Sequence, residues 1–228
     1  MSDYSLFDIV GPVMIGPSSS HTAGAARLGK TAARLVDGDI VEVKMILHGS
    51  FAATHKGHGT DKALLAGLMG LSPDDEGIKS AFEIAKKRGL QYSFTCEDSG
   101  RHHPNTVKFI IKTSPGETHE ITGSSTGGGR IIISTVDGLE LNFTGERNML
   151  VTRHKDTPGV ISHITALLYE YRVNIGNMNV SRNRDDGIAG MYMETDNQLD
   201  TELIEKIRQV PGVLEARQLT ALYDGGGV

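Results

Sequence analysis

Residues 149–171, MLVTRHKDTPGVISHITALLYEY, carry the pattern that decides the fold of the C-terminal part of the chain. The apolar stretch 149–154 predicts a strand, and apolar side chains recur at helical spacing over 160–171. Asp156-Thr157-Pro158-Gly159 stands between them, and these residue types favour a turn that opens a helix. The stretch therefore predicts a strand, a turn and a helix in succession.

Further elements follow toward the C-terminus. Strands are predicted over 174–182, 188–195 and 213–219, and a helix over 200–209 precedes the last strand. Together with the first strand and helix they give the order βαββαβ, which is that of a ferredoxin-like split unit.

This unit, residues 148–223, resembles an ACT domain, a small regulatory module that commonly binds amino acids. The resemblance implies side-by-side pairing into a homodimer, with effectors bound where the first turn of one copy meets a strand of its neighbour. On this resemblance the effector-binding residues are Asp156, Gly159, Asn174 and Ile175. Turn composition alone gives equal weight to ligand binding and to a plain structural turn. The terminal residues 224–228 contain three glycines and are expected to form a flexible tail.

Residues 1–145 predict a separate domain of mixed α/β type. Alternating apolar residues predict strands over 41–47, 107–111, 131–135 and 139–143, and helices are predicted over 25–36, 61–71 and 75–88. Val136-Asp137-Gly138 predicts a hairpin between the last two strands, which argues against an all-parallel sheet. The expected fold class is α+β, with a mixed α/β domain followed by the ferredoxin-like one.

Composition is that of an ordinary globular protein with room for two domains: 228 residues, 38% hydrophobic and 22% charged. The net charge of −5 gives no support to a nucleic-acid or anionic-membrane partner, and no apolar run approaches the ~20 residues that span a bilayer. The first residues lack the basic segment of a secretory signal. The single cysteine, Cys96, excludes an internal disulfide, so a cytoplasmic location is expected.

The loop Gly16-Pro17-Ser18-Ser19-Ser20-His21-Thr22-Ala23-Gly24 precedes the first predicted helix. Unpaired backbone N–H groups at a helix start favour an anion, and the hydroxyls of Ser18, Ser19, Ser20 and Thr22 would add donors to them. A simple N-cap is the competing interpretation, because Ser and Thr are the usual capping residues. One cap needs only one hydroxyl, so a ligand role is favoured.

Three further runs of small polar residues resemble this loop in composition. Gly57-His58-Gly59-Thr60-Asp61-Lys62 precedes an apolar helix, which would present His58 at a loop tip. His103-Pro104-Asn105 precedes a strand, and Pro104 favours an extended His103. The run 123–129, which includes Ser125, Gly127 and Gly128, would form either an anion-binding loop or a mobile hairpin loop.

Two other patterns match known motifs but lack the context that those motifs need. Residues 24–31, GAARLGKT, fit the phosphate-loop pattern GxxxxGK[ST]. Its interior consists of helix formers and no strand directly precedes it, so nucleotide binding is disfavoured. His55 and His58, with Asp61, could form only a weak metal site, because Gly57 opposes a rigid helical pair.

These polar runs, together with Ser50, resemble the β subunit of the two-subunit, iron–sulfur-dependent L-serine dehydratase. The resemblance covers nearly the whole chain, and the GPSSSHT and GHGTDK runs carry it most specifically. It implies amino-acid catabolism feeding gluconeogenesis, with L-serine converted to pyruvate and ammonia. It also implies a heteromer with an α subunit that ligates the [4Fe–4S] cluster, with no metal on this chain and no activity of the isolated chain. The lone Cys96 agrees with that division.

The resemblance also implies roles for individual residues. The catalytic candidates are His58, His103 and His21, since a histidine near neutral pH can move the Cα proton or orient the substrate. The cluster would bind the leaving hydroxyl as a Lewis acid. The substrate-binding candidates are Ser18, Ser19, Ser20, Thr22, Asn105, Lys62, Ser125, Gly127 and Gly128. His21 has a second interpretation, in which it orients the serine loop and takes no part in proton transfer.

A different class of function competes with this one. The first domain also resembles the allosteric substrate-binding domain that some phosphoglycerate dehydrogenases carry together with an ACT domain. In that case 18–22 would bind an anionic effector, and the chain would regulate without chemistry of its own.

Overall fold

The computed structural model describes residues 13–97, 103–114, 116–183 and 187–221. The chain divides into two compact units, residues 1–138 and 139–228. The helical elements of the first unit are η1 (Ser19–Gly24, a π-helical turn), α2 (Ala25–Arg34), α3 (Gly49–His58), α4 (Thr60–Leu68), η2 (Glu76–Ser80, a 3₁₀ helix) and α5 (Ala81–Arg88).

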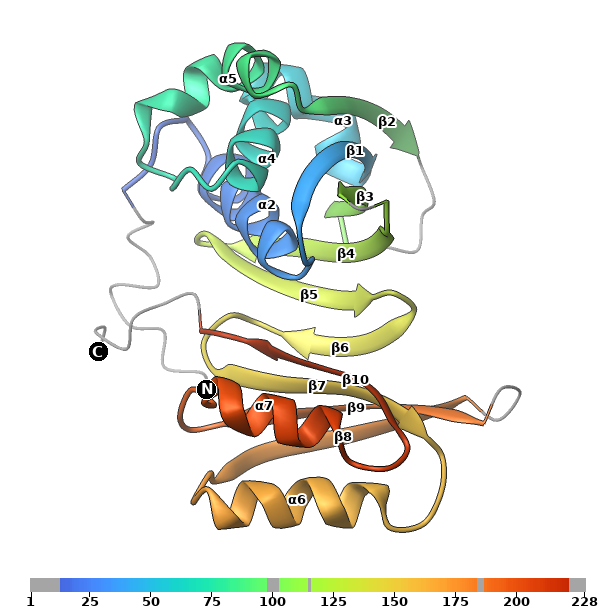
Figure 1. Cartoon of the computed structure of the whole chain (residues 1–228). Helices are drawn as coiled ribbons and strands as arrows, with labels where there is room; N and C mark the ends of the chain where they lie inside the picture. Colours follow the sequence, from blue (N-terminus) through green and yellow to red (C-terminus); the bar gives the residue numbers. More distant parts are fainter. Residues whose placement is uncertain (1–12, 98–102, 115, 184–186, 222–228) are drawn as a thin grey trace, which may run out of the picture. The chain divides into compact units, whose positions relative to one another are not determined.

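A six-stranded mixed sheet accompanies these helices (Figure 1). Its strands are β1 (Asp39–His48), β2 (Gln91–Glu97), β3 (Asn105–Ser114), β4 (Thr118–Gly127), β5 (Arg130–Val136) and β6 (Leu139–Phe143). Their order is β2-β1-β3-β4-β5-β6, with β1 parallel to β2 and antiparallel to β3. The predicted hairpin strands are therefore present, and the sheet is mixed as expected.

Alternation along β1 shows which face of this sheet the helices cover. Val43, Met45 and Leu47 are fully buried, whereas Glu42 before them and Lys44 among them are exposed; Ile46, near the end of the strand, is buried as well. One face of the sheet thus packs under the helices and the other carries charged side chains, as is common for a largely antiparallel sheet.

Helices α2 and α4 cross at two glycines. A Cβ on Gly29 would lie 2.2 Å from the Leu64 carbonyl oxygen, and a Cβ on Gly67 would lie 2.0 Å from the Ala26 carbonyl oxygen. Neither position has room for a side chain, so the two backbones are in direct contact. Gly29 is one of the two glycines of the phosphate-loop pattern 24–31. Because residues 25–31 belong to helix α2, this glycine allows close helix packing and does not lie in a loop.

Several predictions for the first unit were wrong or incomplete. Helix α3 lies where only a loop was expected, and strands β2 and β4 were not predicted. The helix expected over 75–88 is two pieces, η2 and α5. Ser125 belongs to strand β4, so the expected 123–129 loop is reduced to a turn after Gly127.

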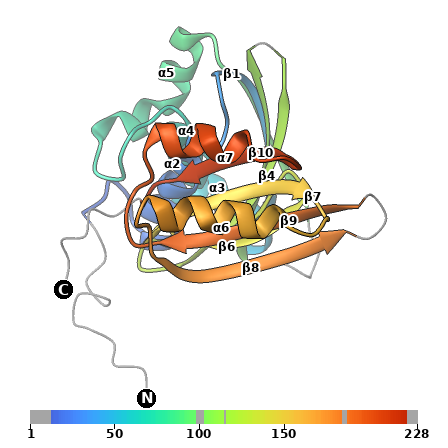
Figure 2. The ribbon, with the colours of Figure 1, turned by 60° about the horizontal axis from the view of Figure 1, so that its bottom comes forward.

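The second unit contains the predicted βαββαβ order. Its elements are β7 (Asn148–Lys155), α6 (Val160–Glu170), β8 (Ile175–Asn183), β9 (Ile188–Thr195), α7 (Thr201–Arg208) and β10 (Val213–Leu219). The sheet order is β10-β7-β9-β8 and its pairs are antiparallel. Figure 2 shows α6 and α7 side by side across one face of this sheet. Leu150, Ile164, Met193, Leu203 and Ile207 are among the buried side chains between them.

None of the helices in the described ranges is both long and apolar enough to cross a membrane.

Candidate functional site

Ser18 caps the helical segment that begins at Ser19. Its backbone is extended, and its Oγ accepts the backbone N–H of His21 at 3.3 Å. The π-helical turn η1 continues directly into α2, and η1 has no acidic residue in its first turn. The predicted helix start is therefore present, with one hydroxyl used as a cap and an N-terminal dipole that no carboxylate of the first turn neutralises.

His21 lies at the centre of a polar contact network. Its Nδ1 is 3.3 Å from Ser18 Oγ and its Nε2 is 3.2 Å from Ser50 Oγ. The Phe51 ring packs edge-on against it with a centroid distance of 5.2 Å, and the His58 ring lies 4.9 Å away. Burial, and then the neighbouring His58, lower the pKa of His21 below its usual value of 6.5. At neutral pH the His21 imidazole is thus uncharged.

His58 is the last residue of helix α3, whereas a loop tip was expected. Gly57 lies within that helix, and Gly59 ends it with φ of +68°. Because α3 begins at Gly49, Ser50 and His58 are eight residues apart and lie on one face of the helix. That face carries two of the α3 side chains that contact His21, namely Ser50 and His58, and His58 keeps an exposed surface.

His103, Asn105 and Ser125 form a second connected group. The Asn105 backbone N–H donates to His103 Nδ1 at 3.2 Å, and Asn105 Nδ2 donates to the Ser125 carbonyl at 3.4 Å. Asn105 is also bridged to Gly49, which precedes Ser50. A Cβ on Gly24 would lie 2.0 Å from Ser125 Oγ, so Ser125 packs directly against the end of η1. The two groups therefore meet at η1 and at the start of α3.

Of the eight buried side-chain atoms without a hydrogen-bond partner among the described residues, four lie in η1, α4, β3 and β4. They are Thr22 Oγ1, Thr60 Oγ1, Asn105 Oδ1 and Ser125 Oγ. Such atoms are few in folded proteins, and each loses the hydrogen bonds that water would supply. A polar ligand at this place would satisfy them.

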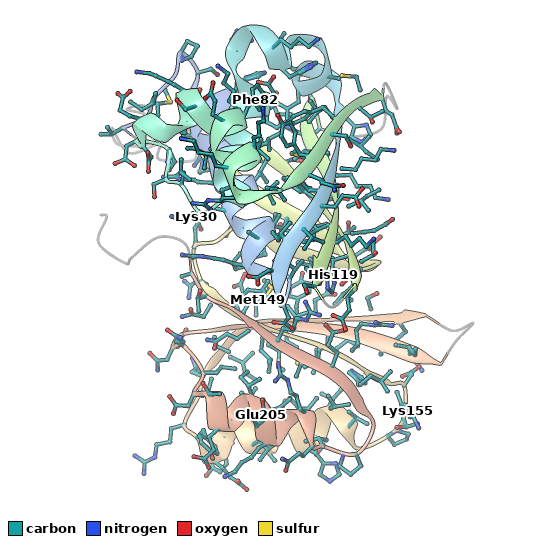
Figure 3. All side chains as sticks on the ribbon, turned by 45° about the horizontal axis from the view of Figure 1, so that its top comes forward. Lys30, Phe82, His119, Met149, Lys155 and Glu205 are labelled. Carbon is teal, nitrogen blue, oxygen red and sulfur yellow. The ribbon has the colours of Figure 1, made fainter. Side chains whose placement is uncertain are left out.

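The remaining predicted substrate ligands take different positions. Ser19 and Ser20 are half-buried on η1, and a Cβ on Gly16 would lie 2.1 Å from Thr22 Oγ1. Gly127 ends β4 and Gly128 begins the turn that follows, which Arg27 anchors by donating to the Gly129 carbonyl at 2.7 Å. Lys62 extends over the ring of Phe82, labelled on α5 in Figure 3, at 5.9 Å from its centroid. No described contact joins Lys62 to His21 or His58.

The predicted effector residues of the ACT domain separate into two places. Asp156 accepts from Arg182 Nε at 2.7 Å and from its Nη2 at 2.6 Å, next to the end of β7 where Figure 3 labels Lys155. Asn174 donates to Asp196 at 2.8 Å at the start of β8. β7 and β8 both run antiparallel to β9, so these two positions lie at opposite ends of the sheet, about 25 Å apart for a nine-residue strand.

The residues of this chain do not fit an iron–sulfur cluster. Such clusters take mostly cysteine ligands, and Cys96 is exposed with its Sγ 3.9 Å from His55 Nδ1. Among the described residues, no group of three or more His, Cys, Asp or Glu side chains could hold a metal ion. His55 and His58 therefore have no third ligand of these types within the part of the chain that the structure describes.

Two residues that the structure places here were not predicted to bind substrate; Thr60, with Asp61 as the alternative, was expected to cap the following helix, and this expectation was wrong because the N-cap of α4 is Gly59. Ser50 belongs to the family resemblance only, and its spacing of eight from His58 would have pointed to it had the helix been predicted through Gly57. Thr60 is of a type that caps helices, but the N-cap of α4 is Gly59 and the Thr60 hydroxyl is buried without a partner. Its burial could not be inferred from local sequence.

Comparison with known proteins places the chain in a family. The family model of the serine dehydratase beta chain matches residues 5–135, and that of the ACT domain matches residues 148–212. The L-serine dehydratase beta chain of Peptoniphilus asaccharolyticus is 42% identical over 204 residues, which cover 89% of this chain and 92% of that one. The probable L-serine dehydratase beta chain of Bacillus subtilis is 40% identical over 215 residues, covering 94% and 97%.

The chain is also similar to enzymes of another class. A D-3-phosphoglycerate dehydrogenase of Synechocystis is 31% identical over 194 residues, which cover 84% of this chain and 35% of that enzyme. The two beta chains above match almost end to end, and their identities are higher. The chain therefore belongs to the serine dehydratase beta chain family and carries an ACT domain after its first unit.

Proposed function

We propose that this chain is the β subunit of an L-serine dehydratase and supplies the carboxylate-binding and proton-transfer half of its active site. The observation that carries the proposal is the contact of His21 with both Ser18 and His58, in a chain whose relatives are named L-serine dehydratase beta chains. L-Serine loses water to give an enamine, which hydrolyses to pyruvate and ammonia.

His58 is the group proposed to take the Cα proton. A general base should have a pKa near the working pH and an exposed face toward the substrate. His58 is exposed at the end of α3, whereas the lowered pKa of its neighbour His21 makes that imidazole a weaker base than an ordinary histidine. His103, whose Nδ1 accepts from Asn105, has Nε2 remaining and is proposed as a second proton-transfer or orienting group.

The substrate carboxylate is proposed to lie at the start of η1. Ser18, Ser19 and Ser20 bring backbone N–H groups to that point, Ser19 and Ser20 add hydroxyls, and helix starts bind anions. The unpartnered Ser125 hydroxyl on β4 would add a donor, whereas Asn105 Oδ1 on β3 can only accept and is proposed to bind the α-ammonium group of the substrate.

The iron–sulfur group is proposed to belong to an α subunit. One cysteine cannot ligate a cluster, and the relatives are named as one chain of an enzyme with more than one. The isolated chain would then lack turnover, because half of the site is on another polypeptide.

The ACT domain is proposed to bind an amino-acid effector in a homodimer. Asp156 with Gly159 and Asn174 with Ile175 lie at opposite ends of one sheet, so one copy alone cannot bring both pairs to a single ligand. A second copy beside the edge strand β8 would supply the missing pair.

Anaerobic coexpression with an L-serine dehydratase α chain tests the proposal. We expect a brown complex that releases pyruvate and ammonia from L-serine, and a colourless isolated chain that does not. A complex that binds L-serine without releasing pyruvate would contradict it.

That contrary outcome would support the second candidate, an effector-binding module without chemistry. The similarity to a phosphoglycerate dehydrogenase over 84% of this chain is the observation in its favour.

A further inference from the structure

We propose that Ser50 is a further substrate-contacting residue of this site, and that His21 is the positioning residue that turns the Ser50 hydroxyl proton toward the substrate carboxylate. This inference rests on the proposed function, since it concerns the same site. It assigns to His21 a role different from proton abstraction.

Ser50 has no local structural task that would explain its hydroxyl. The N-cap of α3 is His48, two positions earlier, and it makes no side-chain cap bond. Ser50 is already inside the helix, where a serine hydroxyl cannot cap the first turn. Its Oγ instead contacts His21 Nε2 at 3.2 Å, across a separation of 29 residues.

The contacts around His21 are compatible with both of its neutral tautomers, and the proposed role requires one of them. In that tautomer, Ser18 Oγ accepts the backbone N–H of His21 at 3.3 Å and donates its own proton to His21 Nδ1, which lies 3.3 Å away. A neutral imidazole has one N–H, which then belongs to Nε2. Nε2–H donates to Ser50 Oγ, and the Ser50 proton must find another acceptor.

The surroundings favour a negatively charged acceptor. The first turns of η1 and α3 contain no acidic residue, so no carboxylate of its own first turn offsets the dipole of either helix start. Ser50 follows Gly49, which is bridged to Asn105, and the unpartnered Asn105 Oδ1 is an acceptor for the ammonium group of the same amino acid. In an α-amino acid the group that accepts a hydroxyl proton at such a place is the carboxylate.

Nitrogen NMR of His21 in the full-length chain tests the assignment without turnover. With ¹⁵N-labelled histidine, the shifts of the two ring nitrogens distinguish the tautomers. We expect an unprotonated Nδ1 and a protonated Nε2 at pH 7, and a loss of this preference in Ser50→Ala or Ser18→Ala. A dominant Nδ1–H tautomer in the wild type would overturn the inference.

Steady-state kinetics of the complex with the α subunit test the carboxylate contact. Ser50→Ala should raise KM for L-serine by roughly 10- to 100-fold, as expected for the loss of a hydrogen bond to a charged group, with a smaller change in kcat. Ser50→Thr keeps the hydroxyl and should recover most of the affinity. Ser80→Ala is the matched control, because Ser80 is exposed at the start of α5 and makes no cap bond.

An unchanged KM in Ser50→Ala would overturn the inference while leaving the proposed function intact. A wild-type complex without serine turnover would instead refute the proposed function, and the tautomer of His21 would still be measurable in the chain alone.

Discussion

At the scale of single residues, His21 and His58 are two histidines in contact with different tasks. Their ring centroids are 4.9 Å apart, and burial together with the proximity of His58 lowers the pKa of His21. Two adjacent imidazoles cannot both be protonated without repulsion, which is one cause of the lowered pKa of His21. On our proposal, His21 positions a neighbouring hydroxyl and His58 takes the proton.

The lowered pKa of His21 predicts how stability depends on pH. An imidazole with a lower pKa in the folded chain binds fewer protons there than in the unfolded chain, whose value is near 6.5. The free energy of unfolding should therefore fall as the pH decreases below about 6.5, and this loss should stop below the folded pKa.

Urea denaturation at several pH values between about 5 and 8 measures this effect, with His21→Gln as the comparison. The variant, which keeps a neutral polar side chain, should lose less stability on acidification than the wild type. Equal losses in both proteins would show that His21 does not contribute.

At the scale of elements, helix α3 positions two of the side chains that meet at His21. It begins at Gly49 and ends at His58, so the chemistry sits at both ends of one short helix. Gly57 lies inside this helix, and a Cβ added there would meet open space. Gly59 follows at φ of +68° with equally open space around it. A side chain would therefore have room at both glycines, but Gly57 has a helical backbone and Gly59 a left-handed one.

Because of this difference, replacement by alanine should change the free energy of unfolding in opposite directions at the two positions. Gly57→Ala should raise the free energy of unfolding by about 0.5–1 kcal/mol, because alanine favours the helix interior. Gly59→Ala should lower it by about 1 kcal/mol or more, since alanine is strained in the left-handed region. Chemical denaturation of both variants checks the pair, and a stabilised Gly59→Ala would contradict the end of α3 at His58.

The crossing of α2 and α4 supports η1, which continues into α2. Gly67→Ala should cost about 1–3 kcal/mol of stability, because its Cβ would overlap the Ala26 carbonyl and force the helices apart. Thermal unfolding followed by circular dichroism measures it, with Gly57→Ala as the control of equal chemistry in open space. A Gly67→Ala protein as stable as the wild type would argue against the close crossing.

The sequence predicts the second unit better than the first, for physical reasons. In each helix and strand of the ACT domain, apolar residues recur at the spacing typical of that element. Turn residues bound these elements, such as Pro211-Gly212 before β10. Strand β4 is rich in threonine, serine and glycine, so its apolar alternation is weak. Helix α3 could not be predicted because Gly57 has a low helix propensity and so indicates a break in the helix. In the folded chain, the contacts around α3 outweigh the propensity of this one glycine.

For the candidate site as well, features set by local sequence could be predicted, whereas contacts between distant residues could not. The start of the first helix could be predicted, since serine before an apolar run is a local signal. The contact of His21 with Ser50 joins residues 29 positions apart, and the packing of Ser125 against Gly24 joins residues from η1 and β4. Such contacts depend on how helices and strands pack against one another, and the local pattern of the sequence does not specify that packing.

At the scale of the whole molecule, the chain consists of two units with separate cores and, on our proposal, separate tasks. The second unit has an open edge strand, β8, on which Met178 is exposed. If ACT domains of two copies pair along this strand, the homodimer depends on the edge being apolar and uncharged at that position.

Met178→Asp should therefore weaken the homodimer, because it places a charge on the pairing edge. Sedimentation velocity over a range of concentrations measures the dissociation. Tyr169→Asp is the matched control, since Tyr169 is exposed on helix α6 away from the edge. A wild-type monomer, or a Met178→Asp dimer of unchanged strength, would contradict pairing along β8.

On our proposal, His58 of this chain is the proton-transfer group of a serine dehydratase, and the turnover of the complex with the α subunit measures its contribution when His58 is replaced. His58→Ala should lower kcat for pyruvate release from L-serine by at least about 100-fold, the usual loss for a general base. Copurification of the two subunits should be unchanged, and His163→Ala on the exposed face of α6 should retain full activity. Wild-type turnover by His58→Ala would contradict the account.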